Sequence, residues 1–363
     1  MQPSFIPPFS VPHLPLILAG LSTFLLCWLI IFSSKWHGHL THDYTDGVQK
    51  FHFYPASRIG GLAILVGLIV GWLTSPSLVN EELKHIFWAS LPAFCFGFAE
   101  DLTHRISTQI RLIATMLSGV LAFLLTGLSL TRVDIFGFDL LLTWVPLSVI
   151  FTAFAVAGIA NAINIIDGFH GLASGTVLIS LASLGYTSYL VNDIVLAKVC
   201  FVLAGIVLGF FLVNYPFGKI FLGDGGAYLL GFWLGWIAVV LVARNPGVSA
   251  WSAVLACAYP ITEVVFSIYR RFARGVNPGQ ADRLHLHSLI KVRLVRKKFP
   301  NLSLASQNPI VSLLLWSLAI IPAALGPVLH NSTAWSVLTF SAFLIIYMKI
   351  YFSLVRFSAF NKI

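Results

Sequence analysis

Charged residues are scarce in this sequence. Asp, Glu, Lys and Arg make up 10% of the 363 residues, whereas soluble domains average about 25%. So few ionisable side chains could not cover the two or three soluble domains that the length alone would suggest. The shortage therefore excludes a soluble multidomain enzyme, a disordered chain and a nucleic-acid-binding module.

Cysteine is also scarce, and basic residues are absent from the beginning of the chain. The four cysteines, Cys27, Cys95, Cys200 and Cys257, lie in apolar runs without CxxC spacing. We therefore expect buried apolar side chains rather than disulfides or metal ligands. No Lys or Arg precedes Lys35. Because a secretory signal peptide starts with a basic segment, the first apolar run is interpreted as a membrane span.

Apolar residues, by contrast, are abundant. They make up 58% of the chain, with 30 Phe and 10 Trp, and the mean hydropathy is +0.89. A membrane-spanning helix needs about 20 mostly apolar residues. We expect an all-α, polytopic membrane protein in which residues 1–363 form a single transmembrane domain. The eleven predicted spans are 13–33, 59–75, 85–99, 110–128, 141–160, 171–191, 195–213, 222–243, 249–268, 309–329 and 333–355.

The distribution of basic residues predicts the orientation of these spans. With eleven spans, all but four of the 22 Lys and Arg residues fall on one side, and basic loops stay in the cytoplasm. We therefore expect the N-terminus outside and the C-terminus in the cytoplasm. The predicted cytoplasmic loops that carry polar motifs are 34–58, 100–110, 161–170, 214–224 and 269–308.

Four acidic residues in these loops are candidates for chemistry. Glu100 and Asp101 form a pair at the end of a span, and Asp167 and Asp224 lie next to glycines, which let a bulky anion approach the backbone. One carboxylate of a pair can act as a general base while the other orients it. Mg²⁺ is usually held by one or two carboxylates together with substrate phosphates. These residues therefore indicate metal-assisted chemistry on an anionic substrate.

The last of these loops adds positive charge. Arg283, His285 and His287 offer donors to phosphate oxygens, and arginine can donate two hydrogen bonds at once. Carboxylates, cations and glycines on one membrane face indicate metal-assisted phosphoryl transfer from a nucleotide. Each cluster alone also has a structural interpretation, as an interfacial cap, a turn or a solvated loop. Their occurrence together on one face favours a catalytic site.

The motifs, in this order, resemble the polyprenyl-phosphate N-acetylhexosamine-1-phosphate transferase family of glycosyltransferase 4 type. Its members include phospho-MurNAc-pentapeptide translocase and undecaprenyl-phosphate GlcNAc-1-phosphate transferase. The resemblance runs from about Asp46 to His287, and its most specific pieces are residues 161–168, 221–226 and 282–287. Any one of these pieces alone is a weak signal, whereas the combination is strong.

The resemblance implies a reaction and a location. It implies transfer of a sugar-1-phosphate, expected to be an N-acetylhexosamine-1-phosphate, from a UDP-sugar to undecaprenyl phosphate, with release of UMP. This would be the first membrane step of a cell-surface polysaccharide such as O-antigen or capsule. We therefore expect a Mg²⁺-dependent phosphotransferase, with Mn²⁺ as the alternative ion, in the bacterial inner membrane with its active site facing the cytoplasm. Its expected partners are the two substrates and the bilayer, without nucleic acid, and a homodimer is left open.

The resemblance also implies a role for each motif residue. Asp224 matches the metal-binding aspartate, and Asp167 matches a position for metal or nucleotide. Asp101, with Glu100 in support, matches the acidic pair that acts on the lipid phosphate. The expected catalytic residues are thus Glu100, Asp101, Asp167 and Asp224. The expected substrate-binding residues are Lys50, His52, Arg58, Asn161, Asn164, His170, Arg283, His285 and His287.

Several positions depart from the family pattern. Glu100 stands where Asp is usual, His170 replaces an acid, Ala227 replaces Ser, and Ser288 replaces a third His. These departures argue against the muramoyl-pentapeptide enzyme and favour the transferases of surface polysaccharide synthesis, with the sugar left open. Two other functions stay in competition. One is a transporter, which would carry ionisable residues near the middle of the bilayer; the other is a non-catalytic component of polysaccharide assembly.

Overall fold

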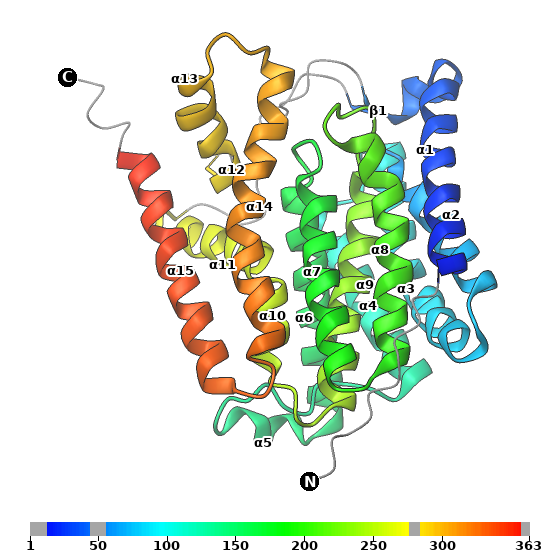
Figure 1. Ribbon diagram of the computed structural model, residues 1–363, viewed down its shortest axis with the longest axis vertical. Helices are drawn as coiled ribbons and strands as arrows, with labels where there is room; N and C mark the ends of the chain where they lie inside the picture. Colours follow the sequence, from blue (N-terminus) through cyan, green and yellow to red (C-terminus); the bar gives the residue numbers. More distant parts are fainter. Residues whose placement is uncertain (1–12, 44–55, 276–283, 357–363) are drawn as a thin grey trace.

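The computed structural model describes residues 13–43, 56–275 and 284–356, and this part of the chain is a bundle of α-helices (Figure 1). Helices suit a lipid environment because they satisfy their backbone hydrogen bonds internally. The helices are α1 (His13–Thr41), α2 (Gly60–Thr74), α3 (Ser77–Thr103), α4 (Thr108–Thr126), α5 (Phe138–Leu142), α6 (Val145–Ile166), α7 (Leu172–Leu190), α8 (Ile194–Asn214), α9 (Gly223–Arg244), α10 (Ala250–Ala256), α11 (Ala258–Ala273), α12 (Leu286–Leu289), the π-helical η1 (Ile290–Val295), α13 (Arg296–Lys298), α14 (Leu304–Val328) and α15 (Thr333–Arg356).

Two very short strands pair beside the helix ends. β1 (His42–Asp43) and β2 (Ala56–Ser57) are antiparallel, and Ser57 also bridges to Ile220. The backbone N–H groups of Gly60 and Gly61 continue this contact, because they donate to the carbonyls that precede α9. The pairing therefore fixes the start of α2 against the start of α9.

Each of the eleven predicted spans overlaps a helix or, at 249–268, a bent pair of helices. In the described residues, seven helices are long and apolar enough to cross a membrane, or eight if the bent pair is one span. α10 and α11 meet at 88°, a break that the prediction of one span at 249–268 did not include. A polytopic, all-α membrane protein is thus confirmed, whereas the count of eleven spans stays a prediction.

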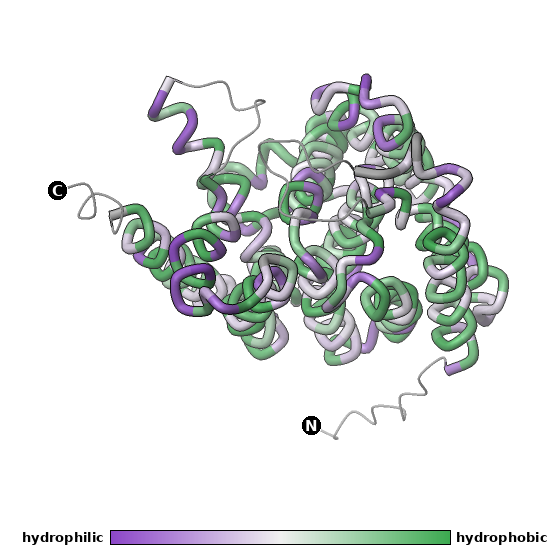
Figure 2. The backbone as a smooth tube through the Cα atoms, turned by 90° about the horizontal axis from the view of Figure 1, so that it is seen from above, coloured by the Kyte–Doolittle hydropathy of each residue, from purple (hydrophilic) through white to green (hydrophobic). Residues whose placement is uncertain are grey.

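The two ends of the bundle differ in what they carry. α1 and α15 run in the same direction, upward in Figure 1, as an odd number of crossings requires. The ends of α3 and α6 lie with the start of α9 at the upper end in this view, and α5 lies at the lower end. Seen from above, mostly apolar helices are interrupted by short hydrophilic stretches (Figure 2). The orientation relative to the cytoplasm stays a prediction.

α9 forms the centre of the bundle. It packs against α3 and α6, and almost every residue along it is buried. Small residues permit this close packing: a Cβ on Gly97 of α3 would lie 2.7 Å from the carbonyl carbon of Asp224. Any larger residue at position 97 would therefore push α3 away from the first turn of α9.

The outer helices expose apolar side chains, as a lipid-facing surface should. Leu25, Phe32, Ile113 and Trp335 are examples. One sequence prediction was wrong here: Cys95 is exposed, while the other three cysteines are buried. Cys95 lies next to the exposed Phe96 on α3, and a small apolar side chain is as suitable for contact with lipid as for a protein core.

Candidate functional site

The acidic pair at the end of α3 is divided between two tasks. Both carboxylate oxygens of Asp101 accept hydrogen bonds from backbone N–H groups in the first turn of α9, those of Asp224 and Gly225, each at 2.8 Å. The first N–H groups of a helix lack intrahelical partners and carry partial positive charge. Asp101, which is 1% exposed, therefore caps α9 from another helix and fixes the position of Asp224.

Glu100 points to a different partner. Its Oε2 accepts the backbone N–H of Ile106 at 2.6 Å, in the turn that joins α3 to α4. The chain reverses here through His104, whose φ is 53°, a left-handed conformation that non-glycine residues seldom adopt. Glu100 thus stabilises the turn that brings α4 beside α3.

Asp224 is the point where four segments of the chain meet. Its Oδ1 accepts a hydrogen bond from Asn164 Nδ2 at 2.8 Å and lies 3.4 Å from Arg58 Nη2. Its Oδ2 forms an ion pair with Arg111. Arg58 Nη2 also lies 3.9 Å from Asp101 Oδ1. Two guanidinium groups thus compensate two buried carboxylates, which would otherwise carry a large desolvation cost.

Arg111 is a residue of this centre that the sequence analysis missed. It lies in the first turn of α4, and its guanidinium carbon is 5.6 Å from the centre of the Tyr228 ring. Tyr228 in turn donates its hydroxyl to Asn161 Oδ1 at 3.2 Å. The available signal was position: Arg111 follows the acidic pair by one short turn. In the sequence, Arg111 counts only among the basic residues that predict the orientation of the spans.

Asn161 and Asn164 both face this centre, because residues three apart share one side of a helix. Asp167 follows directly as the C-cap of α6. Burial raises the pKa of the Asp167 carboxyl well above its usual range, as does the nearby Asp101, while Arg58 and the N–H groups at the start of α9 lower it. The structure therefore brings Arg58, Asn164, Asp101, Asp167 and Asp224 together, and their roles stay predictions.

The histidine motif lies on a separate support. Glu263 of α11, which is 1% exposed, accepts hydrogen bonds at Oε1 from His285 Nδ1 and from the backbone N–H of Leu286, both at 3.0 Å. Its Oε2 accepts the Tyr347 hydroxyl at 2.9 Å. The His285 and His287 rings stack with centroids 5.2 Å apart. Glu263 thus holds the start of α12 against α11 and α15, and the sequence analysis missed this role too.

His287 continues the stack toward the loop after α6. Its ring meets the edge of Phe169 at 5.3 Å between centroids. Burial lowers the pKa of His287 to about 3; Glu263 opposes this shift and His285 adds to it. His287 is therefore a neutral imidazole at physiological pH, able to donate one hydrogen bond and accept another.

His170 occupies a packed joint between three segments. Its Nδ1 donates to the carbonyl of Pro216 at 2.8 Å, and its Nε2 accepts from Asn308 Nδ2 at 3.2 Å. Asn308 also accepts a hydrogen bond from Lys291 Nζ at 2.5 Å. This geometry gives His170 a structural role that links two loops to α14, and its contact with substrate stays a prediction. Lys50, His52 and Arg283 lie outside the described residues.

The fit of a divalent ion can be judged from the donor set. Among the described residues, no group of three His, Cys, Asp or Glu side chains could hold a metal. Mg²⁺ needs fewer protein ligands when substrate phosphates complete its shell. Two guanidinium groups already pair with Asp224, so an ion at this carboxylate would have to displace them toward the phosphates of the substrate. The residues present fit an ion held by one or two carboxylates and a phosphorylated substrate.

Fold and site together define a polytopic helical membrane protein with a buried carboxylate–guanidinium centre at one end of its bundle. The profile of glycosyl transferase family 4 matches residues 84–242, a stretch that contains all four candidate catalytic acids. The chain is 30% identical over 280 residues to the undecaprenyl-phosphate alpha-N-acetylglucosaminyl 1-phosphate transferase of Thermotoga maritima, covering 77% of this chain and 82% of that protein. Proteins with the same name from Yersinia pestis and Escherichia coli K12 are each 29% identical, over 67% of both chains. The protein belongs to glycosyl transferase family 4.

Proposed function

We propose that this protein transfers an N-acetylhexosamine-1-phosphate from a UDP-sugar to undecaprenyl phosphate and releases UMP. The observation that carries the proposal is the convergence of Asn164, Arg58 and Arg111 on Asp224 at the start of α9. Such a centre combines a carboxylate that can hold a cation with guanidinium groups that can bind phosphate. The names of the relatives support this reaction, and the sugar is assigned here by that similarity.

The divalent ion belongs to this proposal. Asp224, with Asp167 beside it, would hold Mg²⁺ or Mn²⁺, and the ion would neutralise charge on the diphosphate. Arg58 and Arg111, which pair with Asp224 in this structure, would turn to the phosphate oxygens when the nucleotide binds. Phosphoryl transfer depends mainly on positioning and charge stabilisation, and these side chains provide both.

The bond changes follow from the substrates. An oxygen of undecaprenyl phosphate attacks the phosphorus that carries the sugar, and the bond from that phosphorus to the bridging oxygen breaks. UMP leaves with the bridging oxygen and its electron pair, and the lipid becomes a diphosphate linked to the sugar. A phosphate monoester has a second pKa near 6, so much of the lipid phosphate is already a dianionic nucleophile at neutral pH.

Asp101 then acts as a positioning residue rather than as a base. Both of its oxygens are occupied by N–H groups of α9, so a substrate proton would have to displace one of them. Its adjacent acid, Glu100, is bonded to the α3–α4 turn. We propose that the pair sets the geometry around Asp224, and that the lipid phosphate attacks directly.

The setting of the reaction is part of the same proposal. Eleven spans would put the site on the cytoplasmic face of the bacterial inner membrane, where UDP-sugars are available. The product would then be the first membrane intermediate of a cell-surface polysaccharide. The opposing transporter hypothesis requires ionisable residues near the middle of the bilayer, whereas the acids here lie at the ends of α3 and α6 and at the start of α9.

The test is release of labelled UMP by the purified full-length protein with undecaprenyl phosphate and a panel of UDP-sugars, with and without EDTA. We expect release with a UDP-N-acetylhexosamine, loss of release in EDTA and recovery with Mg²⁺. Asp224→Asn should be inactive, and Asp139→Asn, at the opposite end of the bundle, is the matched control. A folded protein that releases no UMP from any UDP-sugar would overturn the proposal and would favour a transporter or a non-catalytic component instead.

A further inference from the structure

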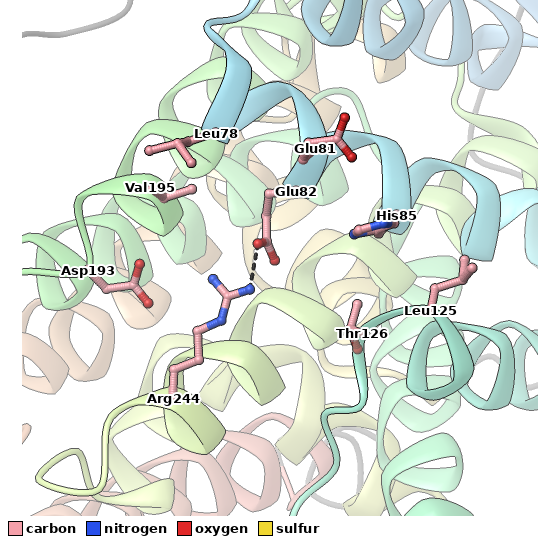
Figure 3. A pocket seen from close by; sticks show the side chains of 9 residues that line it. All are labelled: Leu78, Glu81, Glu82, His85, Leu125, Thr126, Asp193, Val195 and Arg244. Atoms are coloured by element: carbon pink, nitrogen blue, oxygen red, sulfur yellow. Dashed lines mark hydrogen bonds and ion pairs between the residues drawn. The ribbon is translucent and has the colours of Figure 1, made fainter.

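A second group of charged residues lies at the end of the bundle opposite the catalytic centre. A cavity of about 420 Å³ opens between the starts of α3 and α8 and the ends of α4 and α9 (Figure 3). On α3, Glu82 and Asp101 mark the two ends, and a rise of about 1.5 Å per residue puts them roughly 29 Å apart. The lining residues are Leu78, Glu81, Glu82, His85, Leu125, Thr126, Asp193, Val195 and Arg244.

Glu82 lines this cavity, and one of its two carboxylate oxygens lacks a hydrogen-bond partner among the described residues. Its side chain is 10% exposed, and Oε2 accepts a hydrogen bond from Arg244 at 2.5 Å. Its Oε1 is buried and has no hydrogen-bond partner within the described part of the chain. A buried carboxylate oxygen without a donor is costly, so the cavity favours an occupant that brings an N–H or O–H group.

The charge of the residues that line the cavity favours a cation as its occupant. Glu81, Glu82 and Asp193 supply three carboxylates, whereas Arg244 supplies one guanidinium. Glu81 is paired at 3.4 Å with Lys84, and both are largely exposed. Asp193 caps α8 through the Leu196 N–H. These partners leave Glu82 Oε1 as the unfilled acceptor, and the described residues contain no three-ligand group for a metal ion. A protonated amine fits this pattern because it brings both positive charge and N–H donors.

The surroundings indicate that the amine belongs to a lipid. Leu78 is 72% exposed and Leu125 is 44% exposed beside the cavity, at an end of the bundle where spans leave the bilayer. Arg244 is 32% exposed and has donors that can meet a phosphodiester. We propose that this cavity binds the headgroup of phosphatidylethanolamine, with the ammonium group on Glu82, the phosphate beside Arg244 and the acyl chains along the exposed leucines.

The experiment compares two lipids that differ only at the amine. Phosphatidylethanolamine carries an ammonium group with N–H donors, and phosphatidylcholine carries three methyl groups instead. The full-length protein is equilibrated with an equimolar mixture of the two, and retained lipid is counted by native mass spectrometry. We expect the wild type to retain the ethanolamine lipid about tenfold over the choline lipid, the scale of one hydrogen bond to a charged group.

Variants of Glu82 and of its neighbour Glu81 separate this site from general lipid contact. Glu82→Gln should bring the ratio close to one, whereas the adjacent, exposed Glu81→Gln should keep the preference. If Glu82→Gln does not fold because Arg244 is left unpaired, the double variant Glu82→Met with Arg244→Met removes both charges and should also lose the preference. UMP release should be unchanged in every folded variant, because the catalytic centre is at the far end of α3.

Three results would overturn the proposal. Equal retention of the two lipids by the wild type would show that no amine is recognised. An unchanged preference in Glu82→Gln or in the double variant would place recognition elsewhere. Displacement of the retained lipid by an equal concentration of free ethanolamine would show that the cavity takes the soluble amine and not the lipid headgroup.

Discussion

Replacing Asp101 by Asn tests whether this carboxylate holds the catalytic centre together. The aspartate offers two oxygens to two backbone N–H groups of α9, and asparagine offers one oxygen and one NH₂ group. One hydrogen bond to a charged group is lost and one buried N–H is left without an acceptor, a single loss worth about 1.5–3 kcal/mol. We therefore expect Asp101→Asn to lower the free energy of unfolding by about 1.5–3 kcal/mol, with activity falling as the α9 start loses its position.

The measurement is equilibrium unfolding in mixed micelles, followed by tryptophan fluorescence, together with UMP release. Asp139→Asn is a matched control, because Asp139 also accepts a backbone N–H, that of Val133 at 2.8 Å, at a more exposed site. The control should change stability by less than about 1 kcal/mol. An Asp101→Asn protein as stable as the wild type but inactive would refute the capping role and restore Asp101 as a group that acts on substrate.

Further changes test the remaining parts of the structure. Asp224→Asn should lower turnover on the order of 100-fold or more, the scale for removal of a group that stabilises the transition state. The variant should still insert into the membrane and unfold cooperatively. Turnover close to that of the wild type would show that Asp224 has no catalytic role. Glu263 has two carboxylate oxygens that accept three hydrogen bonds, and Glu263→Gln leaves only one oxygen to accept them. The histidine motif should then lose its position, and the KM for the UDP-sugar should rise by about tenfold. An unchanged KM would show that the histidine motif takes no part in nucleotide binding. The pKa of His287 is about 3 in the folded protein and about 6.5 in the unfolded chain. Because the unfolded state binds more protons between these two values, the free energy of unfolding should fall as the pH drops from 7 to 5. His287→Gln should reduce that fall in thermal unfolding scans, and an equal fall would contradict the burial of this ring. In a cysteine-free background, Asn301→Cys should react with an impermeant reagent only from the cytoplasmic side and Asn331→Cys only from outside; reaction of both from one side would reject the proposed orientation.

The helices could be predicted from the sequence because each needs only a local property. An apolar run of suitable length forms a helix in lipid whatever its neighbours are, so every predicted span coincides with helical structure. The bend between α10 and α11 could not be predicted this way. It lies at Cys257, inside a continuous apolar run, and it depends on how both halves pack against other helices.

The candidate site was predictable only in part. Asp224 stands out because it lies between glycines, and Asn164 because it is a polar residue at the end of an apolar run. Arg111 and Glu263 do not, because each lies within a helix and its partner is far away in the sequence. Arg111 meets Asp224 across 113 positions, and Glu263 meets His285 across 22. Periodicity and spacing carry no information about such contacts, which arise only when the helix ends are brought together.

The acidic pair shows why adjacent motif residues need not share a function. Successive residues on an α-helix point about 100° apart, so Glu100 and Asp101 face different neighbours from the last turn of α3. Asp101 faces inward to α9, and Glu100 faces the α3–α4 turn. That turn leads into the first turn of α4, where Arg111 lies, and the start of α9 carries Asp224. Asp101 therefore positions Asp224, and Glu100 positions the turn that leads to Arg111. A change at either acid should displace Arg111 and Asp224 relative to each other.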